Sequence, residues 1–426
     1  MNFNRIMPLI AAFLVIGIAG SLYLYNETRA DLRVTLLDSE QTSAELLSLT
    51  ESFEAVSAQI EALSQSNSQL EARIAELETE PDVPPVIVEK PDIVLDVTAG
   101  GDVRNVILLI GDGMGVGQLT AAEAVNGDEG LVMRSLPYKS LVTTYSVSGY
   151  VTDSAASATA LATGYKTSNG AISMSSTGEV FTTVVEFAEA LGMSTGVVTN
   201  TRVTHATPAC FMAHVSNRGS ETTIAQQVLA SGVDVILGGG STYFSSLDPA
   251  RAGYTVVATT SELMNVDSDM VLGLFNADYM SYDSLRDPLV EPSVAEMTRK
   301  SIELLSGDPD GFFLMVEGGR IDHASHDNNF DLTMGETFAF DAAVLEALKY
   351  ASGRNDTLVV VTADHETGGL LIIGGYTTSG TPQYKWIGDD HTGSMVPVYA
   401  YGPMAEMVIG FSDNTDIGRF LISVIE

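Results

Sequence analysis

Hydrophobic and polar positions follow three different patterns along the chain, and the first pattern covers the N-terminus. Residues 6–25 carry no charged side chain and come directly after Arg5. An apolar stretch of this length can span a bilayer as a helix, so we predict a transmembrane anchor in residues 1–26. A cleavable signal segment, which usually has a shorter apolar stretch, is the alternative interpretation.

A heptad pattern follows in residues 31–80. Apolar residues recur alternately three and four positions apart, and Asn67 occupies one place in this series. The spacing predicts a coiled-coil stalk, in which a single Asn favours two strands; one amphipathic helix lying on the protein is the alternative. Residues 81–101 contain several prolines and predict a semi-rigid linker. The heptad series comprises Leu46, Leu49, Phe53, Val56, Ile60, Leu63, Asn67, Leu70, Ile74 and Leu77.

From residue 102 onward, short uninterrupted apolar runs alternate with helix-like segments. Residues 106–110, 312–316 and 358–362 are three such runs, each with the length of a strand. Continuous hydrophobicity is typical of strands that are buried in a parallel sheet. We therefore predict that residues 102–426 form one α/β domain, a three-layer sandwich with a central, mostly parallel sheet.

Each of these three runs leads directly into acidic or histidine residues. Asp112 follows the first run, Glu317 the second, and Asp364 with His365 the third. In an open α/β sheet, sites form beyond the carboxyl ends of the strands. These four side chains are therefore expected to converge, although they lie far apart in the sequence.

Histidines cluster with acids in the second half of the chain. Asp322 and His326 are four positions apart, which places them on one face of a helical turn. A carboxylate and an imidazole at this spacing can share a metal ion. His214 is interpreted as a structural residue. The other five histidines lie in segments rich in acids or glycines: His205, His323, His326, His365 and His391.

A candidate nucleophile lies in residues 151–160. Asp153 and Ser154 stand side by side and are followed by small, helix-forming residues. The first turn of a helix has unpaired N–H groups and the positive end of the dipole, so it favours an anion. A phosphoryl group on Ser154 would be held there. For an isolated Asp-Ser pair, a simple helix cap is the ordinary interpretation, but the acid and histidine clusters favour a nucleophile.

The overall charge limits the partners of the chain. It has 20 Lys and Arg against 55 Asp and Glu, a formal net charge of -35. This charge disfavours nucleic acid and anionic membrane surfaces as electrostatic partners, and a site for anionic substrates would need bound cations. Cys210 is the single cysteine, so no internal disulfide can form.

Taken together and in this order, the motifs resemble those of the alkaline phosphatase family. Each motif alone is weak, but the series is highly specific and extends from about residue 102 to the end. The matching segments are residues 111–115, 152–160, 206–209, 214–218, 317–322 with His326, 362–365 and 391–394.

The resemblance implies hydrolysis of phosphate monoesters through a phosphoserine on Ser154, with two zinc ions and one magnesium or other divalent ion. It implies that Arg218 grips the substrate phosphate and that Asp153 lies beside the site. The implied ligands are Asp322, His326 and His391 for the first zinc, Asp112, Asp364 and His365 for the second, and Asp112, Thr207 and Glu317 for the third metal.

These residue types suit the implied chemistry. No general base for Ser154 is evident in the sequence, and a metal ion can replace one by lowering the pKa of a hydroxyl group. Arg218 offers a planar fork that matches two phosphate oxygens. His205 and His323 stand where an aspartate and a lysine often occur in the family. They leave the identity of the third metal open.

The resemblance also implies the direction of export, while the apolar segment and the heptads bear on location and assembly. We expect an exported protein, either anchored in the inner membrane and facing the periplasm, or secreted or periplasmic if the N-terminus is cleaved. We expect self-association, with a homodimer favoured over a trimer. The alternatives to a phosphomonoesterase are another hydrolase of the superfamily, a phosphodiesterase or a sulfatase, and an inactive stalked scaffold.

Overall fold

The computed structural model describes residues 95, 101–127, 130–375 and 381–426. The chain divides into two units, Met1–Pro85 and Val86–Glu426, and the described residues all belong to the second. The anchor predicted in residues 1–26 and the coiled coil predicted in residues 31–80 lie outside the described residues and stay predictions. Within the described part of the chain, no helix is both long enough and apolar enough to cross a membrane.

A nine-stranded sheet forms the centre of the second unit, with the strand order β2-β13-β8-β1-β7-β3-β4-β6-β5. The six neighbouring pairs from β8 to β5 are parallel, whereas β13 is antiparallel to both β8 and β2. The prediction of an α/β fold with a mostly parallel central sheet is therefore confirmed. The strands are β1 (Asn105–Gly111), β2 (Tyr138–Val142), β3 (Ser194–Arg202), β4 (Val235–Gly239), β5 (Thr255–Val257), β6 (Val271–Leu274), β7 (Phe312–Gly318), β8 (Thr357–Thr362) and β13 (Val396–Tyr401).

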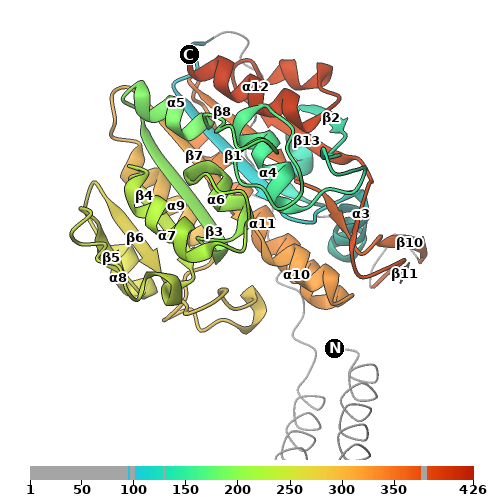
Figure 1. The fold of residues 1–426 in the computed structure, drawn as a ribbon. Coiled ribbons are helices and arrows are strands. Elements are labelled where there is room, and N and C mark those ends of the chain that lie inside the picture. Colours follow the sequence, from blue (N-terminus) through green and yellow to red (C-terminus); the bar gives the residue numbers. More distant parts are fainter. Residues whose placement is uncertain (1–94, 96–100, 128–129, 376–380) are drawn as a thin grey trace, which may run out of the picture. The chain divides into compact units, whose positions relative to one another are not determined.

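Helices cover both faces of this sheet (Figure 1). Helices α9 and α11 pack on each other and on β7, whereas α5 and α6 pack together and also reach β7. The helices are α3 (Val116–Asn126), α4 (Ser154–Thr163), α5 (Val184–Ala190), α6 (Ala206–Met212), α7 (Glu221–Ala230), α8 (Thr260–Asn265), α9 (Val294–Leu305), α10 (Arg320–His326), α11 (Phe330–Ala351) and α12 (Asn414–Ile425).

The three apolar runs found in the sequence lie within β1, β7 and β8, which are neighbours in the middle of the sheet. Every residue of these strands is buried, which explains why their hydrophobicity does not alternate. Their register brings Ile110 of β1 opposite Glu317 of β7 and Thr362 of β8. The residues that follow β1 and β8 therefore emerge at the same edge of the sheet as Glu317.

Short strands after β8 complete this edge. Strand β9 (Glu366–Thr367) pairs with β12 (His391–Thr392) in an antiparallel ladder. This pairing brings His391 next to the residues that follow β8, with His391 opposite Thr367. Strands β10 (Leu371–Gly374) and β11 (Gln383–Lys385) form a separate hairpin between them.

Candidate functional site

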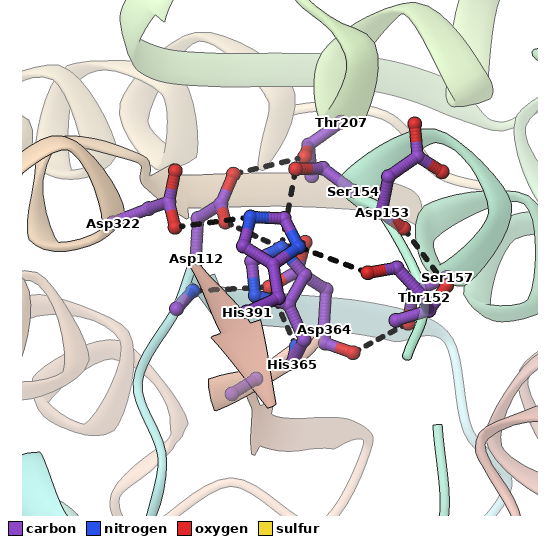
Figure 2. Close-up of polar contacts among 12 residues, drawn as sticks. Asp112, Thr152, Asp153, Ser154, Ser157, Thr207, Asp322, Asp364, His365 and His391 are labelled. Atoms are coloured by element: carbon purple, nitrogen blue, oxygen red, sulfur yellow. Dashed lines mark hydrogen bonds and ion pairs between the residues drawn. The ribbon is translucent and has the colours of Figure 1, made fainter. Parts of the chain in front are cut away.

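A fully buried cluster of ligand-type side chains lies beyond β1 and β8. Asp112, Asp364 and His365 each have 0% of their surface exposed, and Figure 2 shows them pointing toward one another. His365 Nε2 is 3.3 Å from Asp112 Oδ1 and 3.3 Å from Asp364 Oδ2. The backbone N–H groups of Gly113 and His365 donate to Asp364 Oδ1 at 3.2 and 2.9 Å, so this carboxylate is oriented by the backbone around it.

A second cluster forms between α10 and β12. His326 Nε2 lies 3.4 Å from Asp322 Oδ2, and His391 Nε2 lies 3.6 Å from Asp322 Oδ1. The Nδ1 atoms of both rings contact backbone carbonyl oxygens. His326 Nδ1 lies 2.6 Å from the carbonyl oxygen of Asp389, and His391 Nδ1 lies 2.9 Å from that of Thr152. Contacts of this kind orient the opposite nitrogen toward a metal. The two Nε2 atoms are only 3.1 Å apart.

A third group shares Asp112 with the buried cluster. Ligand-type atoms of Asp112, His205 and Glu317 lie within 4.8 Å of one another. The Thr207 hydroxyl donates to Asp112 Oδ2 at 3.4 Å, so the threonine implied as a ligand borders this group. Glu317 Oε2 accepts hydrogen bonds from the hydroxyl groups of Thr199 and Thr201 on β3.

Three buried carboxylate oxygens in these groups lack a hydrogen-bond partner: Asp112 Oδ1, Asp364 Oδ2 and Glu317 Oε1. Burial, reinforced by the neighbouring carboxylate of Asp364, raises the pKa of Asp112 well above its usual value. Burial likewise raises the pKa of Asp364 and that of Glu317. Buried polar atoms without partners are costly and call for an explanation. Divalent cations would satisfy all three oxygens, and carboxylate with imidazole is a donor set that suits zinc.

Ser154 lies directly against the buried cluster. It is the first residue of α4, it is 2% exposed, and its Oγ is 3.2 Å from His365 Nε2. Asp153, rather than Ser154, is the helix cap, because its Oδ1 accepts the N–H of Ala156 at 2.9 Å. The hydroxyl of Ser154 is therefore not used for capping and faces the ligand clusters.

Arg218 stands on the other side of Asp153. Its Nη1 donates to Asp153 Oδ2 at 3.1 Å, and its Nη2 lies 3.1 Å from His205 Nε2. The same Asp153 oxygen accepts the N–H of Gly170 at 3.0 Å, which fixes the carboxylate that orients the guanidinium. With 29% of its side chain exposed, Arg218 can reach an anion that enters from solvent.

His323 does not join any of the ligand clusters. Its Nδ1 is 2.7 Å from Arg320 Nη1, and its ring packs against Tyr279 with centroids 4.4 Å apart. Burial lowers the pKa of His323 to about 4, with Arg320 adding to the effect. Burial and the nearby Arg218 also lower the pKa of His205. Both imidazoles are therefore neutral near pH 7.

Two residues of the site were not identified by the sequence analysis. Thr367 donates to Asp322 Oδ1 at 2.5 Å and lies 3.2 Å from His365 Nδ1, so it touches both ligand clusters. Its position two residues after His365 was the only available signal. Tyr279 lies in a loop after β6, where neither periodicity nor a motif singles it out.

Comparisons with known proteins agree with this geometry. A family model described as Alkaline phosphatase matches residues 103–389 and 382–426. Alkaline phosphatase 4 of Bacillus subtilis is 32% identical over 76% of this chain and 89% of its own length. Streptomycin-6-phosphate phosphatase of Streptomyces griseus is 36% identical over 74% of this chain and 88% of its own length. The crystal structure of a cold-active alkaline phosphatase from Shewanella sp. has a TM-score of 0.70 at 33% identity, covering 76% of this chain and all of that one.

Proposed function

The chain belongs to the alkaline phosphatase family, and from that premise we propose that it hydrolyses phosphate monoesters through a phosphoserine intermediate on Ser154. The observation that carries the proposal is the position of Ser154 Oγ. It lies at the start of α4, 3.2 Å from a ligand atom of the fully buried cluster. A relative named for the monoester streptomycin-6-phosphate supports this substrate class.

The three groups of acids and histidines would hold two zinc ions and a third divalent ion. Asp322, His326 and His391 would bind the first zinc, and Asp112, Asp364 and His365 the second. Asp112, Glu317 and Thr207 would bind magnesium or another divalent ion, with His205 at its edge. Structures of two variants of TAB5 alkaline phosphatase, in which a histidine is replaced by Asp or Glu, have Mg bound in a site called M3. They support a third site for a divalent ion and link magnesium there to a carboxylate residue.

When bound, such cations lower the pKa of a nearby hydroxyl group and neutralise charge on the transferring phosphoryl group. The protein's own residues supply position and exclusion of water. Ser154 is held at a helix N-terminus, where free N–H groups favour the phosphoryl oxygens. Arg218, oriented by Asp153, offers a planar pair of donors to two of those oxygens.

The neutral imidazoles distinguish this site from one with a carboxylate and an ammonium group at the same positions. His205 offers the third ion a neutral nitrogen rather than a carboxylate oxygen, and His323 brings no positive charge at neutral pH. Magnesium prefers oxygen ligands. The third ion is therefore bound less tightly than a site with a carboxylate at position 205 would bind it. Phosphate is released more readily than from a site with an ammonium group at position 323.

Export and self-association belong to the same proposal. The uncharged residues 6–25 support a membrane anchor or a cleaved signal, with the catalytic domain of residues 102–426 outside the cytoplasm. The heptads of residues 31–80 support a dimer, with a trimer as the alternative.

The test of the mechanism is Ser154→Ala beside Ser157→Ala. Ser157 is one turn further along α4, where its hydroxyl donates to the Asp364 carbonyl oxygen at 2.6 Å and accepts from Asn414 at 2.8 Å. We expect Ser154→Ala to remove the trapped phosphoenzyme and most activity. Ser157→Ala should keep the intermediate and lose about 1 kcal/mol of stability.

Labelled phosphate, trapped at mildly acidic pH and located by peptide mapping, is the measurement. A label on any residue other than Ser154 contradicts the mechanism. Hydrolysis rates for a phosphate monoester, a phosphate diester and a sulfate ester test the substrate class in parallel. Faster cleavage of the diester or the sulfate ester would identify the chain as another hydrolase of the superfamily, and no cleavage would favour the scaffold.

A further inference from the structure

Two buried polar side chains outside the ligand clusters meet at the base of α10. Asn200, near the end of β3, is 6% exposed, and Glu336, on α11, is 2% exposed. Asn200 Nδ2 donates to Glu336 Oε2 at 2.9 Å. Neither residue belongs to the groups of candidate metal ligands, so their burial needs a separate explanation.

Asn200 caps α10, the helix that carries Asp322 and His326 of the second cluster. Its Oδ1 accepts the backbone N–H groups of Gly319 at 2.8 Å and Arg320 at 3.2 Å. Gly319 is the cap residue of α10 and has no side chain with which to cap it. The free N–H groups of a helix start need such a partner, and here a neighbouring strand provides it. The same helix then presents Asp322 and His326.

Glu336 connects this cap to the loop that covers His323. Its Oε1 accepts the backbone N–H of Asp283 at 2.6 Å, in the 3₁₀ turn η4 (Asp283–Leu285). The ring of the preceding residue, Tyr282, lies 3.9 Å from the guanidinium carbon of Arg320. Glu336 therefore ties α11, the cap of α10 and this loop into one network.

We propose that Asn200 and Glu336 are positioning residues that set the zinc affinity of the cluster of Asp322, His326 and His391. The network fixes the start of α10 and with it the distance from Asp322 and His326 to His391, which comes from a different part of the chain. This inference rests on the proposed function in one respect, namely that the cluster binds a divalent metal. Outer partners of ligands commonly change metal affinity by about 10–100-fold.

The hydrogen-bond polarity of the network makes the inference testable. Glu336 presents two acceptor oxygens to two donors, Asn200 Nδ2 and the N–H of Asp283. In Glu336→Gln one acceptor becomes a donor, so the new amide nitrogen faces either the donor of Asn200 or the N–H of Asp283. If Asn200 turns its amide over to relieve the first clash, its donor then faces the N–H groups of Gly319 and Arg320. Every arrangement loses one contact of the network that fixes the start of α10.

A reciprocal exchange restores the pattern. In the double variant Asn200→Asp with Glu336→Gln, the introduced amide donates to the introduced carboxylate. The other carboxylate oxygen still accepts from Gly319 and Arg320, and the amide oxygen still accepts from Asp283. A residue that merely fills space would give no such recovery, because both single and double variants keep nearly the same volume.

The experiment is stepwise zinc removal from the full chain by graded chelator, with zinc per chain as the readout. The cluster of Asp322, His326 and His391 is the more exposed one, and we assign to it the weaker of the two zinc-binding steps. We expect Glu336→Gln to weaken zinc binding in this step about tenfold and to leave the tighter step unchanged. Zinc affinity should return to the wild-type value in the double variant. Glu189→Gln is the matched control. Burial raises the pKa of Glu189, like that of Glu336, to about 7, but Glu189 bonds to Thr195 beside α5, away from α10.

Five outcomes decide the inference. A tenfold shift of the weaker step that the double variant reverses supports it, including the case in which Glu336→Gln alone fails to fold and the double variant folds with wild-type zinc binding. Equal shifts of both steps overturn it, as does no shift, or a shift that the exchange does not reverse. If the wild-type chain takes up no zinc, the proposed function fails as well. If the wild type binds zinc and the variants bind it equally, only the role of Asn200 and Glu336 fails.

Discussion

The two ligand clusters beside Ser154 differ in burial and in the elements that hold them. Asp112, Asp364 and His365 are completely buried and follow β1 and β8, two adjacent parallel strands. In the other cluster the side chain of His326 is 35% exposed and that of His391 10%. These two histidines come from a short helix and a two-residue strand. The sheet therefore fixes one cluster rigidly, whereas the other depends on contacts between separate segments.

The clusters also differ in how they compensate charge. In the half-exposed cluster, formed by Asp322, His326 and His391, the hydrogen bond that His326 donates to Asp322 raises the pKa of His326 to about 9. Despite burial, the contact with His326 holds the pKa of Asp322 well below its usual range. This cluster can therefore bind a proton in place of a metal. Burial raises the pKa values of Asp112 and Asp364 and lowers that of His365, so no internal ion pair forms there. In the proposed function, the buried cluster would depend on a metal for charge balance.

The largest difference is expected between substitutions of one ligand in each cluster. Asp112 belongs to two of the three ligand groups, so Asp112→Asn should weaken two metal sites together. We expect kcat/KM to fall by about 10³-fold or more, in the range that one stabilising charge contributes to phosphoryl transfer. His391→Gln affects a single, more exposed site, and added zinc should restore much of its activity.

Activity and zinc content measured at increasing zinc concentrations test this difference. His214→Gln is the control, because His214 bonds to Glu186 and the Ser173 carbonyl oxygen and lies in none of the clusters. It should keep wild-type zinc content. Full recovery of Asp112→Asn by zinc, with none for His391→Gln, would reverse the comparison.

Chelation should distinguish the clusters by rate and by stability. The metal of the half-exposed cluster should leave first, because a proton can replace it on His326. The metal of the buried cluster should leave later and with the larger drop in melting temperature, because Asp112 Oδ1 and Asp364 Oδ2 lose their only expected partner. At a free metal concentration of 1,000 Kd, one site contributes about 4 kcal/mol. Calorimetry with parallel zinc analysis would show one step instead of two if the clusters were equivalent.

The same contrast explains what the sequence could predict. The buried cluster follows continuous apolar strands, and parallel strands in register bring their carboxyl ends together, so Asp112, Glu317 and Asp364 could be grouped in advance. The i,i+4 spacing similarly paired Asp322 with His326. The place of His391 rested on the family resemblance, because its approach depends on the β9–β12 pairing, which leaves no periodic signal.

Strand β3 shows where pattern analysis fails. Near the end of this strand, Ser194–Arg202, lie Thr199, Asn200 and Thr201, which interrupt the apolar run although all three are buried. They are polar because they serve Glu317 and α10. Residues selected for hydrogen bonding inside a core break the pattern by which strands are recognised, and only the tertiary structure reveals their partners.

The smallest expected effect concerns pH in the metal-free protein. The pKa of His326 is raised from 6.5 to about 9, so its contribution to stability is fully present below pH 6.5 and is lost as the pH rises through 9. Because the side chain is 35% exposed, solvent screening limits this contribution to about 1 kcal/mol. For His323 the pKa is lowered to about 4, so its contribution is present above pH 6.5 and is lost as the pH falls toward 4.

Denaturant unfolding of the metal-free chain between pH 6.5 and 9 measures the first effect, and NMR titration of the imidazole signals measures both pKa values. His326→Gln should flatten the slope in this window because the titrating group is gone, whereas His214→Gln should leave the His326 signal unchanged. Zinc and the proton compete for the same nitrogen, so zinc affinity of the half-exposed cluster should rise with pH until about 9. In the buried cluster the histidine has a lowered pKa, so a pH dependence of its zinc affinity should come from the raised pKa values of Asp112 and Asp364 rather than from an imidazole. If His326→Gln left the pH dependence of zinc affinity unchanged, His326 and Asp322 would not form an ion pair in solution, and the electrostatic half of the comparison would fail.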